Sequence, residues 1–469
     1  MPKIAMIGAG SVVFTQQFLN DLLQVEALQG VELCLMSPTL SKLEKIRDWA
    51  ERACGKNDFQ ANITITTDRK AALQDADYVI NTMKIGGSVE SLDREIPLRY
   101  GVNQAIGDSI GPGGVFRAAR TVPIVLELVH DMEKLSPEAL LLNYSNPMAM
   151  VCAAIGHNSQ IHFSGMCHGI QTTLGLIAAF TDTPKGEIEY HCAGINHMAW
   201  FLEIHHKGVD LYPLLRENIE KPAYYLSDKV RCETMRHFGY MMTESSEHLS
   251  EYLPWFRKRA DLLAEFFSTE SFGRTAGKVN SEEGKRLFQN PIDLLDHEDG
   301  SLNPRSDEFC SHIIEAMETG KKFRFNGNII NQGYIENLPD GACVEVPIVV
   351  ENGVLTPQKV GSLPAQLAAL NLTNINMQML GAEAVVKGDP ELLFAAVAMD
   401  PLTQAVCSLA ETRNMVCDMM EAQKQFLPQF EGKSLKRLPK IIVPAGTEPV
   451  ETPIDPALAI SHRIAKLFS

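Results

Sequence analysis

Three residues in two short polar stretches have side chains that could together hold a metal ion. Cys167 and His168 lie in SGMCHGIQTT, and His197 lies in CAGINHMAWF. A thiolate and a neutral imidazole are ligands for borderline or soft divalent metals, and a gap of about thirty residues is not the spacing of a zinc finger. Each residue alone is more typical of a core or a helix end. Asp108 and Asn146 also stand at the ends of apolar runs, so the set predicts a site at the carboxyl ends of parallel strands.

The beginning of the sequence, KIAMIGAGSVVF, has the pattern of a dinucleotide-binding turn. Gly8 would allow the tight turn, Gly10 would let the backbone approach a pyrophosphate, and the helix that starts near Ser11 would direct its amides toward the phosphates. Val13 replaces the third glycine of the fingerprint, but the turn lies between a predicted strand and a predicted helix, as this site requires. Ser37 stands where an acid usually binds the adenosine ribose, which leaves NAD and NADP both open.

Alternating strand-like and helix-like segments would position these residues. The apolar runs KIAMIGA, VELCLM, DYVINTM, ALLLNYS and QIHFSGMCH predict strands, and the last of them ends at the Cys-His pair. Helical periodicity over residues 18–28, 40–54 and 118–135 predicts strand–helix–strand units and therefore a parallel sheet. We expect an α/β protein whose residues 1–200 form an NAD-binding Rossmann domain of the lactate/malate dehydrogenase kind.

Residues 201–469 are expected to form a mixed α+β domain for substrate binding and oligomerisation. Helices are predicted over residues 281–296 and 306–318, and FRFNGNIINQGYIENLP and ACVEVPIVVENGVL are typical of antiparallel strands. The stretch from 361 to 425 is predominantly helical in pattern. The tail from about residue 427 is rich in proline and ends in a short predicted helix.

Composition narrows the function classes. The 469 residues include 42 Lys and Arg against 58 Asp and Glu, which gives a net charge of −16. Nucleic acid and anionic membranes are therefore unexpected partners. No secretory leader and no membrane span is evident, and the 10 cysteines are scattered rather than arranged as a disulfide framework, so we expect free thiols in the cytoplasm.

Longer motifs carry a family resemblance. GAGS, GDSIGPGG, NYSNPMAM, CHG, AGINHMAW and TESSEHLSEYLPWF follow one another over nearly the whole chain to about residue 425. In these motifs the chain resembles glycoside hydrolase family 4, and within it the bacterial α-galactosidases. The resemblance implies hydrolysis that uses NAD and a divalent metal, usually manganese, and is an exception to two-carboxylate glycosidase chemistry. A dinucleotide site and a Cys/His metal site would then serve one reaction.

The implied reaction is a transient oxidation. Hydride passes from sugar carbon-3 to NAD, and a base removes the carbon-2 proton, which the new carbonyl has made acidic. A Lewis-acidic metal stabilises the enediolate, the aglycone leaves by elimination, water adds, and the hydride returns. The cofactor supplies the redox chemistry and the protein supplies the positions.

The resemblance also implies roles for single residues that bind metal or substrate. Cys167 and His197 match the metal ligands of the family. Asn146, in SNP, matches the asparagine that binds substrate beside the metal. Asn196 is expected to contact the sugar or support the metal from behind, and Arg117 to reach the sugar or a phosphate.

The catalytic groups follow from the same resemblance. Asp108 matches an acid near the sugar. His168 stands where some relatives carry a general acid, and a protonated imidazole could fill that role. Tyr252, in SEYLPWF, matches the base at carbon-2, with Glu244 as the next candidate.

Several alternatives stay open at this level. A dehydrogenase of the malate/lactate type needs no metal thiolate, and a non-catalytic nucleotide sensor would leave the metal residues unexplained. Within the family, Gly169 after the Cys-His pair is more typical of α-glucosidases or α-glucuronidases, whereas the whole sequence favours α-galactosidases. We expect an unphosphorylated α-glycoside as substrate, best an α-galactoside, and a homodimer or homotetramer.

Overall fold

Apolar runs in the first part of the chain form the parallel half of a large sheet. The computed structural model has the strands β1 (Lys3–Ile7), β2 (Val31–Met36), β3 (Ala61–Thr66), β4 (Tyr78–Asn81), β5 (Leu140–Asn143) and β6 (Phe163–Gly165). They pair in parallel in the order β3-β2-β1-β4-β5-β6, which is the strand order of dinucleotide-binding folds. The predicted Rossmann-type sheet is confirmed. β3 was not among the predicted strands, because its partly exposed side chains give no apolar run.

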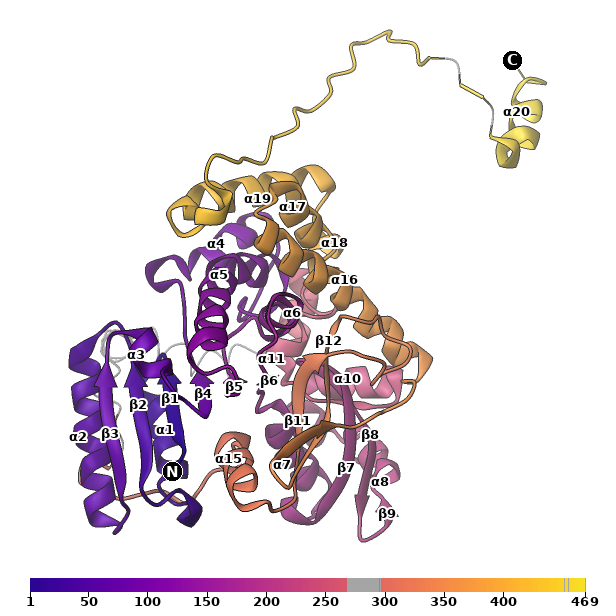
Figure 1. The fold of residues 1–469 in the computed structure, drawn as a ribbon. Helices are drawn as coiled ribbons and strands as arrows, with labels where there is room; N and C mark the ends of the chain where they lie inside the picture. The colour runs from indigo at the N-terminus through magenta and orange to yellow at the C-terminus, as the bar shows by residue number, and fades with distance from the viewer. Residues whose placement is uncertain (268–294, 296, 451, 454, 469) are drawn as a thin grey trace. The chain divides into compact units, whose positions relative to one another are not determined.

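The second half of the sheet is antiparallel. Its strands are β7 (Ile188–Ile195), β8 (Met198–His206), β9 (Val209–Asp210), β10 (Met241–Met242), β11 (Phe323–Ile330), β12 (Cys343–Glu351) and β13 (Val354–Pro357). β11 pairs with β6 and so joins both halves into one 13-stranded sheet. The segments FRFNGNIINQGYIENLP and ACVEVPIVVENGVL were predicted to be antiparallel strands. This prediction is confirmed, because they contain β11 and β12, which pair in that way. The hairpin of β7 and β8 was not predicted (Figure 1).

Helices cover the parallel strands and build the region around the antiparallel ones (Figure 1). The first group is α1 (Val12–Leu22), α2 (Leu40–Lys56), α3 (Arg69–Leu73), α4 (Leu92–Arg99), α5 (Gly111–Leu135), α6 (Met148–Asn158) and α7 (Gly169–Thr181). The second group is α8 (Tyr212–Ile219), α9 (Pro222–Ser227), α10 (Lys229–Phe238), α11 (Ser246–Leu249), α12 (Ala260–Phe266), α15 (Phe309–Thr319), α16 (Ala365–Lys387), α17 (Pro390–Ala398), α18 (Pro401–Val406) and α19 (Leu409–Gln423).

Most predicted helices are confirmed. α2 and α5 contain the periods seen at 40–54 and 118–135, α15 matches 306–318, and α16 to α19 fill the helical stretch that follows residue 361. The helix predicted over residues 18–28 is too long at its C-terminal end, because α1 ends at Leu22 and only a short 3-10 turn follows it. The helix predicted at 281–296 lies, except for residue 295, outside the described residues.

The middle of the sheet is the core of the protein. β4 and β5 are buried along their full length, and β1 is buried except at its first residue. Parallel strands with helices on both faces have this continuous apolar character. Each fully buried Leu or Ile side chain contributes roughly 1.5–3 kcal/mol, and α5 packs against both α6 and α16. The loops at the carboxyl ends of β4, β5 and β6 therefore start from a rigid base.

The structure describes residues 1–267, 295, 297–450, 452–453 and 455–468. They fall into two units, Met1–Lys436 and Arg437–Ser469, and the second contains the short helix α20 (Ala459–Ala465). The domain boundary expected near residue 200 falls within β8, a strand of the single sheet. The boundary stays a prediction. Among the described helices, none has the length and apolar character needed to cross a membrane.

Candidate active site

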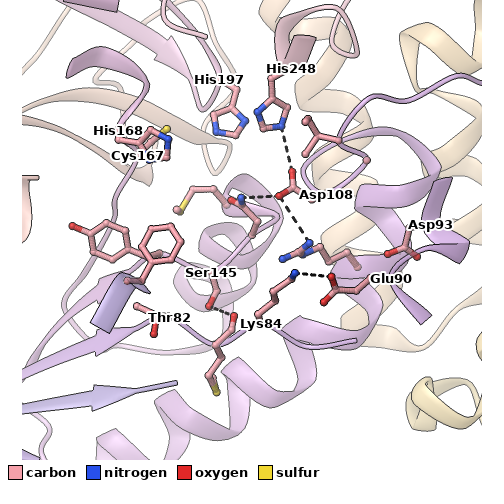
Figure 2. Close-up of a pocket in the computed structure, with 18 of the residues that line it drawn as sticks. Thr82, Lys84, Glu90, Asp93, Asp108, Ser145, Cys167, His168, His197 and His248 are labelled. Atoms are coloured by element: carbon pink, nitrogen blue, oxygen red, sulfur yellow. Dashed lines mark hydrogen bonds and ion pairs between the residues drawn. The ribbon is translucent and has the colours of Figure 1, made fainter. Parts of the chain in front are cut away.

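A cavity of about 580 Å³ opens at the carboxyl ends of three parallel strands. Thr82 and Met83 follow β4, Ser145 follows β5, and Cys167 follows β6. Ser11, at the start of α1, lines the same cavity. Ligands bind at this edge in open α/β sheets, so the cavity is the candidate active site (Figure 2).

Three side chains in the cavity form a candidate metal site. The Cys167 sulfur, a nitrogen of His197 and a carboxylate oxygen of Glu244 all lie within 4.8 Å of one another. Cys167 and His197 were predicted as ligands from the sequence, and the structure brings them together. Glu244 adds an oxygen ligand, and the mixed sulfur, nitrogen and oxygen set suits a borderline divalent cation.

One backbone contact of Cys167 favours its thiolate form, against the opposite effect of burial. The residue lies just before α7, and the Gly169 amide donates a hydrogen bond to its sulfur at 3.4 Å. A helix N-terminus lowers the free energy of an adjacent anion. Gly169 has no room for a side chain, because a Cβ there would lie 2.9 Å from the Thr243 carbonyl oxygen and 3.4 Å from Glu244.

His197 is held in its neutral form by its surroundings. It lies in the two-residue turn between β7 and β8 with φ of 62°, a conformation that histidine adopts more often than most residues. Burial and the neighbouring His248 lower the pKa of His197 to about 4. The Tyr252 hydroxyl lies 3.3 Å from Nδ1, and Nε2 lies 3.5 Å from Glu244. A neutral imidazole with one nitrogen directed toward Glu244 can act as a ligand.

The charges in this cluster fit a divalent cation. Burial and the carboxylates of Glu345 and Glu244 raise the pKa of the Cys167 thiol well above its ordinary value. Burial and Glu244 raise the pKa of Glu345 to about 8. A bound divalent cation reverses such mutual repulsion and stabilises the thiolate. The residues present therefore match the metal that the sequence predicted.

Asp108 is the centre of a second, ionic group in the cavity. His248 Nε2 lies 3.2 Å from it, Asn146 donates a hydrogen bond at 3.2 Å, and Arg117 lies 3.9 Å away. Although burial opposes ionisation, His248 and Arg117 hold the pKa of Asp108 well below its usual range. Burial lowers the pKa of His248, but Asp108 and Glu244 raise it to about 9. The Asp108 carboxylate and the His248 ring lie side by side in the cavity (Figure 2), and their pKa shifts favour a carboxylate and an imidazolium near neutral pH.

Glu251 fixes the loop that carries Asp108. This buried carboxylate accepts hydrogen bonds from the backbone amides of Ile106 and Gly107, the latter at 3.0 Å, and from the Gln104 side chain at 3.3 Å. Gln104 in turn accepts from the amide of residue 113 at 3.0 Å. The loop from 104 to 113 is therefore clamped over the cavity.

The predicted dinucleotide turn has the shape that its sequence requires. Gly8 has φ of +96°, and a Cβ on it would lie 2.7 Å from the Met83 amide nitrogen. A Cβ on Gly10 would lie 2.4 Å from the Ser37 hydroxyl. Ser37 is thus at the end of β2 beside the turn, where the ribose-binding acid stands in related folds. Because Gly10 touches Ser37, a larger residue at Gly10 would disturb the protein as well as any cofactor.

The structure places the other predicted site residues in two layers. The first layer lines the cavity and consists of Ser11, Asp108, Arg117, Asn146, Cys167, His168 and His197. Tyr252 and Asn196 are each 1% exposed and lie behind it. Tyr252 contacts His197, and Asn196 lies beside the Cys167 thiol and lowers its pKa. The substrate contact of Asn196 and the base role of Tyr252 stay predictions, and Asn196 fits a supporting position better.

Sequence reasoning missed several residues of the site. Glu244 was considered only as a base, and His248, Glu251 and Glu345 were not considered at all. One signal was available: Glu244, His248 and Tyr252 recur every fourth residue in TESSEHLSEYLPWF, which places them on one face of a helical segment. No sequence signal marked Glu345, which comes from a strand far along the chain.

The comparisons agree with this architecture. The family model described as "Family 4 glycosyl hydrolase" matches residues 3–182, and the model of its C-terminal domain matches residues 192–403. An alpha-galactosidase of Bacillus subtilis (strain 168) is 41% identical and covers 92% of this chain and 100% of its own. An alpha-galactosidase of Rhizobium meliloti (strain 1021) is 36% identical over 91% of this chain and 89% of its own.

More distant relatives and solved structures extend the picture. An alpha-galacturonidase of Lachnoclostridium phytofermentans is 27% identical over 91% of this chain and 97% of its own, and an alpha-glucosidase of Erwinia rhapontici is 28% identical over 90% and 98%. The crystal structure of the lplD protein of Bacillus subtilis has a TM-score of 0.77 at 26% identity and covers 89% of this chain and 99% of its own. A 6-phospho-beta-glucosidase from Thermotoga maritima, solved with manganese, NAD+ and glucose-6-phosphate, has the same fold at a TM-score of 0.72, 21% identity and coverage of 90% and 99%. The chain belongs to glycosyl hydrolase family 4.

Proposed function

We propose that this protein hydrolyses unphosphorylated α-glycosides, α-galactosides above all, through a transient oxidation at sugar carbon-3. One observation carries the proposal: a single cavity is lined both by Ser11 of the dinucleotide turn and by the Cys167, His197 and Glu244 cluster. A dehydrogenase needs only the first of these features and a direct hydrolase needs neither. The two features in one cavity fit a reaction that oxidises and polarises the same sugar.

The cofactors proposed are NAD and a divalent metal, manganese first. Gly8, Gly10, Ser11 and Ser37 would hold the dinucleotide, and Cys167, His197 and Glu244 would hold the metal. When bound, NAD supplies a reversible hydride acceptor and the metal supplies a Lewis acid. The solved relative with manganese and NAD+ supports this pair of cofactors.

The sugar would lie between the cluster and the Asp108 group. Asn146 and Arg117 line the cavity and offer an amide and a guanidinium to sugar hydroxyls. Asp108, held ionised by its neighbours, would accept a hydrogen bond from a hydroxyl and fix its direction. His168, exposed to the cavity, would donate a proton to the departing glycosidic oxygen.

Tyr252 is our proposal for the base that removes the carbon-2 proton, with Glu244 as the alternative. Burial and the surrounding carboxylates raise the pKa of the Tyr252 phenol well above its ordinary value. A divalent cation nearby would act in the opposite direction and favour the phenolate. Glu244 already lines the cavity, whereas Tyr252 lies behind it in contact with His197.

Substrate choice follows from the relatives and the charges. The two alpha-galactosidases are the relatives with the higher identities reported above, which favours α-galactosides over the α-glucosides or α-glucuronides that Gly169 suggested. Among the cations that line the cavity, Lys84 pairs with Glu90 at 2.7 Å and Arg94 donates to the Ala105 carbonyl at 3.2 Å. Arg117 lies 3.9 Å from Asp108, and because Lys84 and Arg117 each have a carboxylate beside them, we expect a sugar without a phosphate.

We also propose a cellular location, an oligomeric state and a division into domains. All 10 cysteines are free thiols, as in a protein of the cytoplasm. We propose a homodimer or homotetramer, with an NAD-binding domain over residues 1–200 and a substrate and oligomerisation domain over residues 201–469.

A panel of nitrophenyl α-glycosides tests the function. With NAD and Mn²⁺ present, we expect the α-galactoside to be cleaved fastest, without accumulation of NADH. A chelator should stop the reaction and added Mn²⁺ should restore it. NADH formed in proportion to product would instead establish a dehydrogenase.

A further inference from the structure

Two strands of the sheet separate the strands that lead to the candidate metal ligands. β6 ends two residues before Cys167, and β7 ends two residues before His197. Between them lie β11 and β12, in the order β7-β12-β11-β6. The distance between the two ligands is therefore set across β11 and β12.

One row of residues crosses these four strands just below the metal site. Gly194 of β7 pairs with Glu345 of β12, Glu345 pairs with Asn328 of β11, and Asn328 pairs with Gly165 of β6. Both end members are glycines, so the polar side chains in the row belong to Glu345 and Asn328. The row joins the ends of both ligand-bearing strands.

The side chains in this row reach toward both ligands. Asn328 donates a hydrogen bond to the Gly165 carbonyl at 3.2 Å. The Asn328 and Asn196 side chains both lie beside the Glu345 carboxylate, and Asn196 is the residue directly before His197. A polar chain thus runs from the Cys167 strand to the His197 turn through Glu345.

We propose that Glu345 is a positioning residue of the metal site, which acts through Asn328 and Asn196 to fix the separation of Cys167 and His197. The inference rests on the proposed metal function of that pair. Glu345 is 1% exposed, and a buried carboxylate costs free energy that a well-packed apolar residue would not. Groups that hydrogen-bond behind metal ligands orient those ligands and tune affinity.

Cobalt(II) is the probe for the test, because a thiolate bound to Co²⁺ gives a charge-transfer absorption band. The wild type and Cys167→Ser are titrated first with Co²⁺, and a band that appears in the wild type but not in Cys167→Ser establishes Cys167 ligation. Glu345→Val removes the hydrogen-bonding group, Glu345→Gln keeps it without charge, and Val346→Ala is a control of similar burial on the same strand. NAD binding and melting temperature are measured for each variant.

We expect Glu345→Val to weaken Co²⁺ binding by about 10–100-fold, as is typical when support behind a metal ligand is lost. Glu345→Gln should restore an affinity and a band close to those of the wild type, and NAD binding should survive in all variants. A wild-type affinity in Glu345→Val would overturn the proposal, as would equal losses in Glu345→Val and Val346→Ala. A Gln variant as weak as the Val variant would show that charge matters and not positioning. Absence of the band in the wild type would defeat the metal assignment itself, which separates the two failures.

Discussion

The Glu251 clamp offers a quantitative test of how the site is assembled. Its carboxylate accepts from the amides of Ile106 and Gly107 and from Gln104. In Glu251→Gln, the amide oxygen can keep the two bonds that one carboxylate oxygen accepts from Gly107 and Gln104, but the amide NH2 then faces the Ile106 amide, another donor. A hydrogen bond to a charged group is worth about 1.5–3 kcal/mol, so the net cost of the change is about 3 kcal/mol.

This cost should appear in catalysis, because the clamped loop presents Asp108. A loss of about 3 kcal/mol in the transition state corresponds to a fall in kcat/KM of about 100-fold. Steady-state kinetics on a nitrophenyl α-galactoside measures it. NAD and Mn²⁺ binding should survive, since the residues proposed to bind them are not among the hydrogen-bond partners of the Glu251 carboxylate. Glu247→Gln is the matched control, because Glu247 belongs to the same segment but pairs with Arg257 at 3.5 Å. Wild-type kinetics in Glu251→Gln, or an equal loss in the control, would refute this reasoning.

Three further changes probe the cofactor turn, the metal loop and the imidazolium. Ser37→Asp should strengthen NAD binding relative to NADP by repelling the ribose phosphate, and fluorescence titration that shows tighter NADP binding would contradict this. Gly169→Ser should weaken Mn²⁺ binding by about tenfold or more, because its Cβ would displace the Glu244 segment; isothermal titration measures the affinity, and an unchanged value argues against Glu244 as a ligand. The pKa of His248 rises to about 9 on folding, so its pairing with Asp108 stabilises the metal-free protein fully below pH about 6.5, and this contribution of about 3 kcal/mol disappears as the pH rises to about 9. The melting temperature of the wild type should exceed that of His248→Gln at pH 6 but not at pH 10. A difference in melting temperature that is constant with pH would refute the pairing.

The parallel half of the fold was predictable because its strands are buried on both faces and therefore read as apolar runs. β1, β2, β4, β5 and β6 were all predicted in this way. β3 was not predicted because none of its side chains is fully buried, so that it forms no apolar run. The β7–β8 hairpin was not predicted for a different reason. Its turn residues Asn196 and His197 were interpreted as a polar interruption of an apolar run and not as the link between two strands.

The site was only partly predictable, because its two layers leave different traces in sequence. Cys167, His197 and Asp108 occupy the ends of elements, where a polar residue after an apolar run is conspicuous. His248 and Glu251 lie within one polar segment and look like ordinary surface residues until the fold brings them against the cavity. Glu345 belongs to a buried strand whose place beside β7 is set by long-range pairing, which no local pattern specifies.

Hydrolysis in heavy water tests the central mechanism most directly. If a base removes the carbon-2 proton after oxidation at carbon-3, the proton that returns comes from solvent. Mass spectrometry of galactose released from an α-galactoside should then show one deuterium bound at carbon-2. Direct displacement never breaks that carbon–hydrogen bond, so galactose without the label would contradict the oxidation–elimination mechanism for this protein.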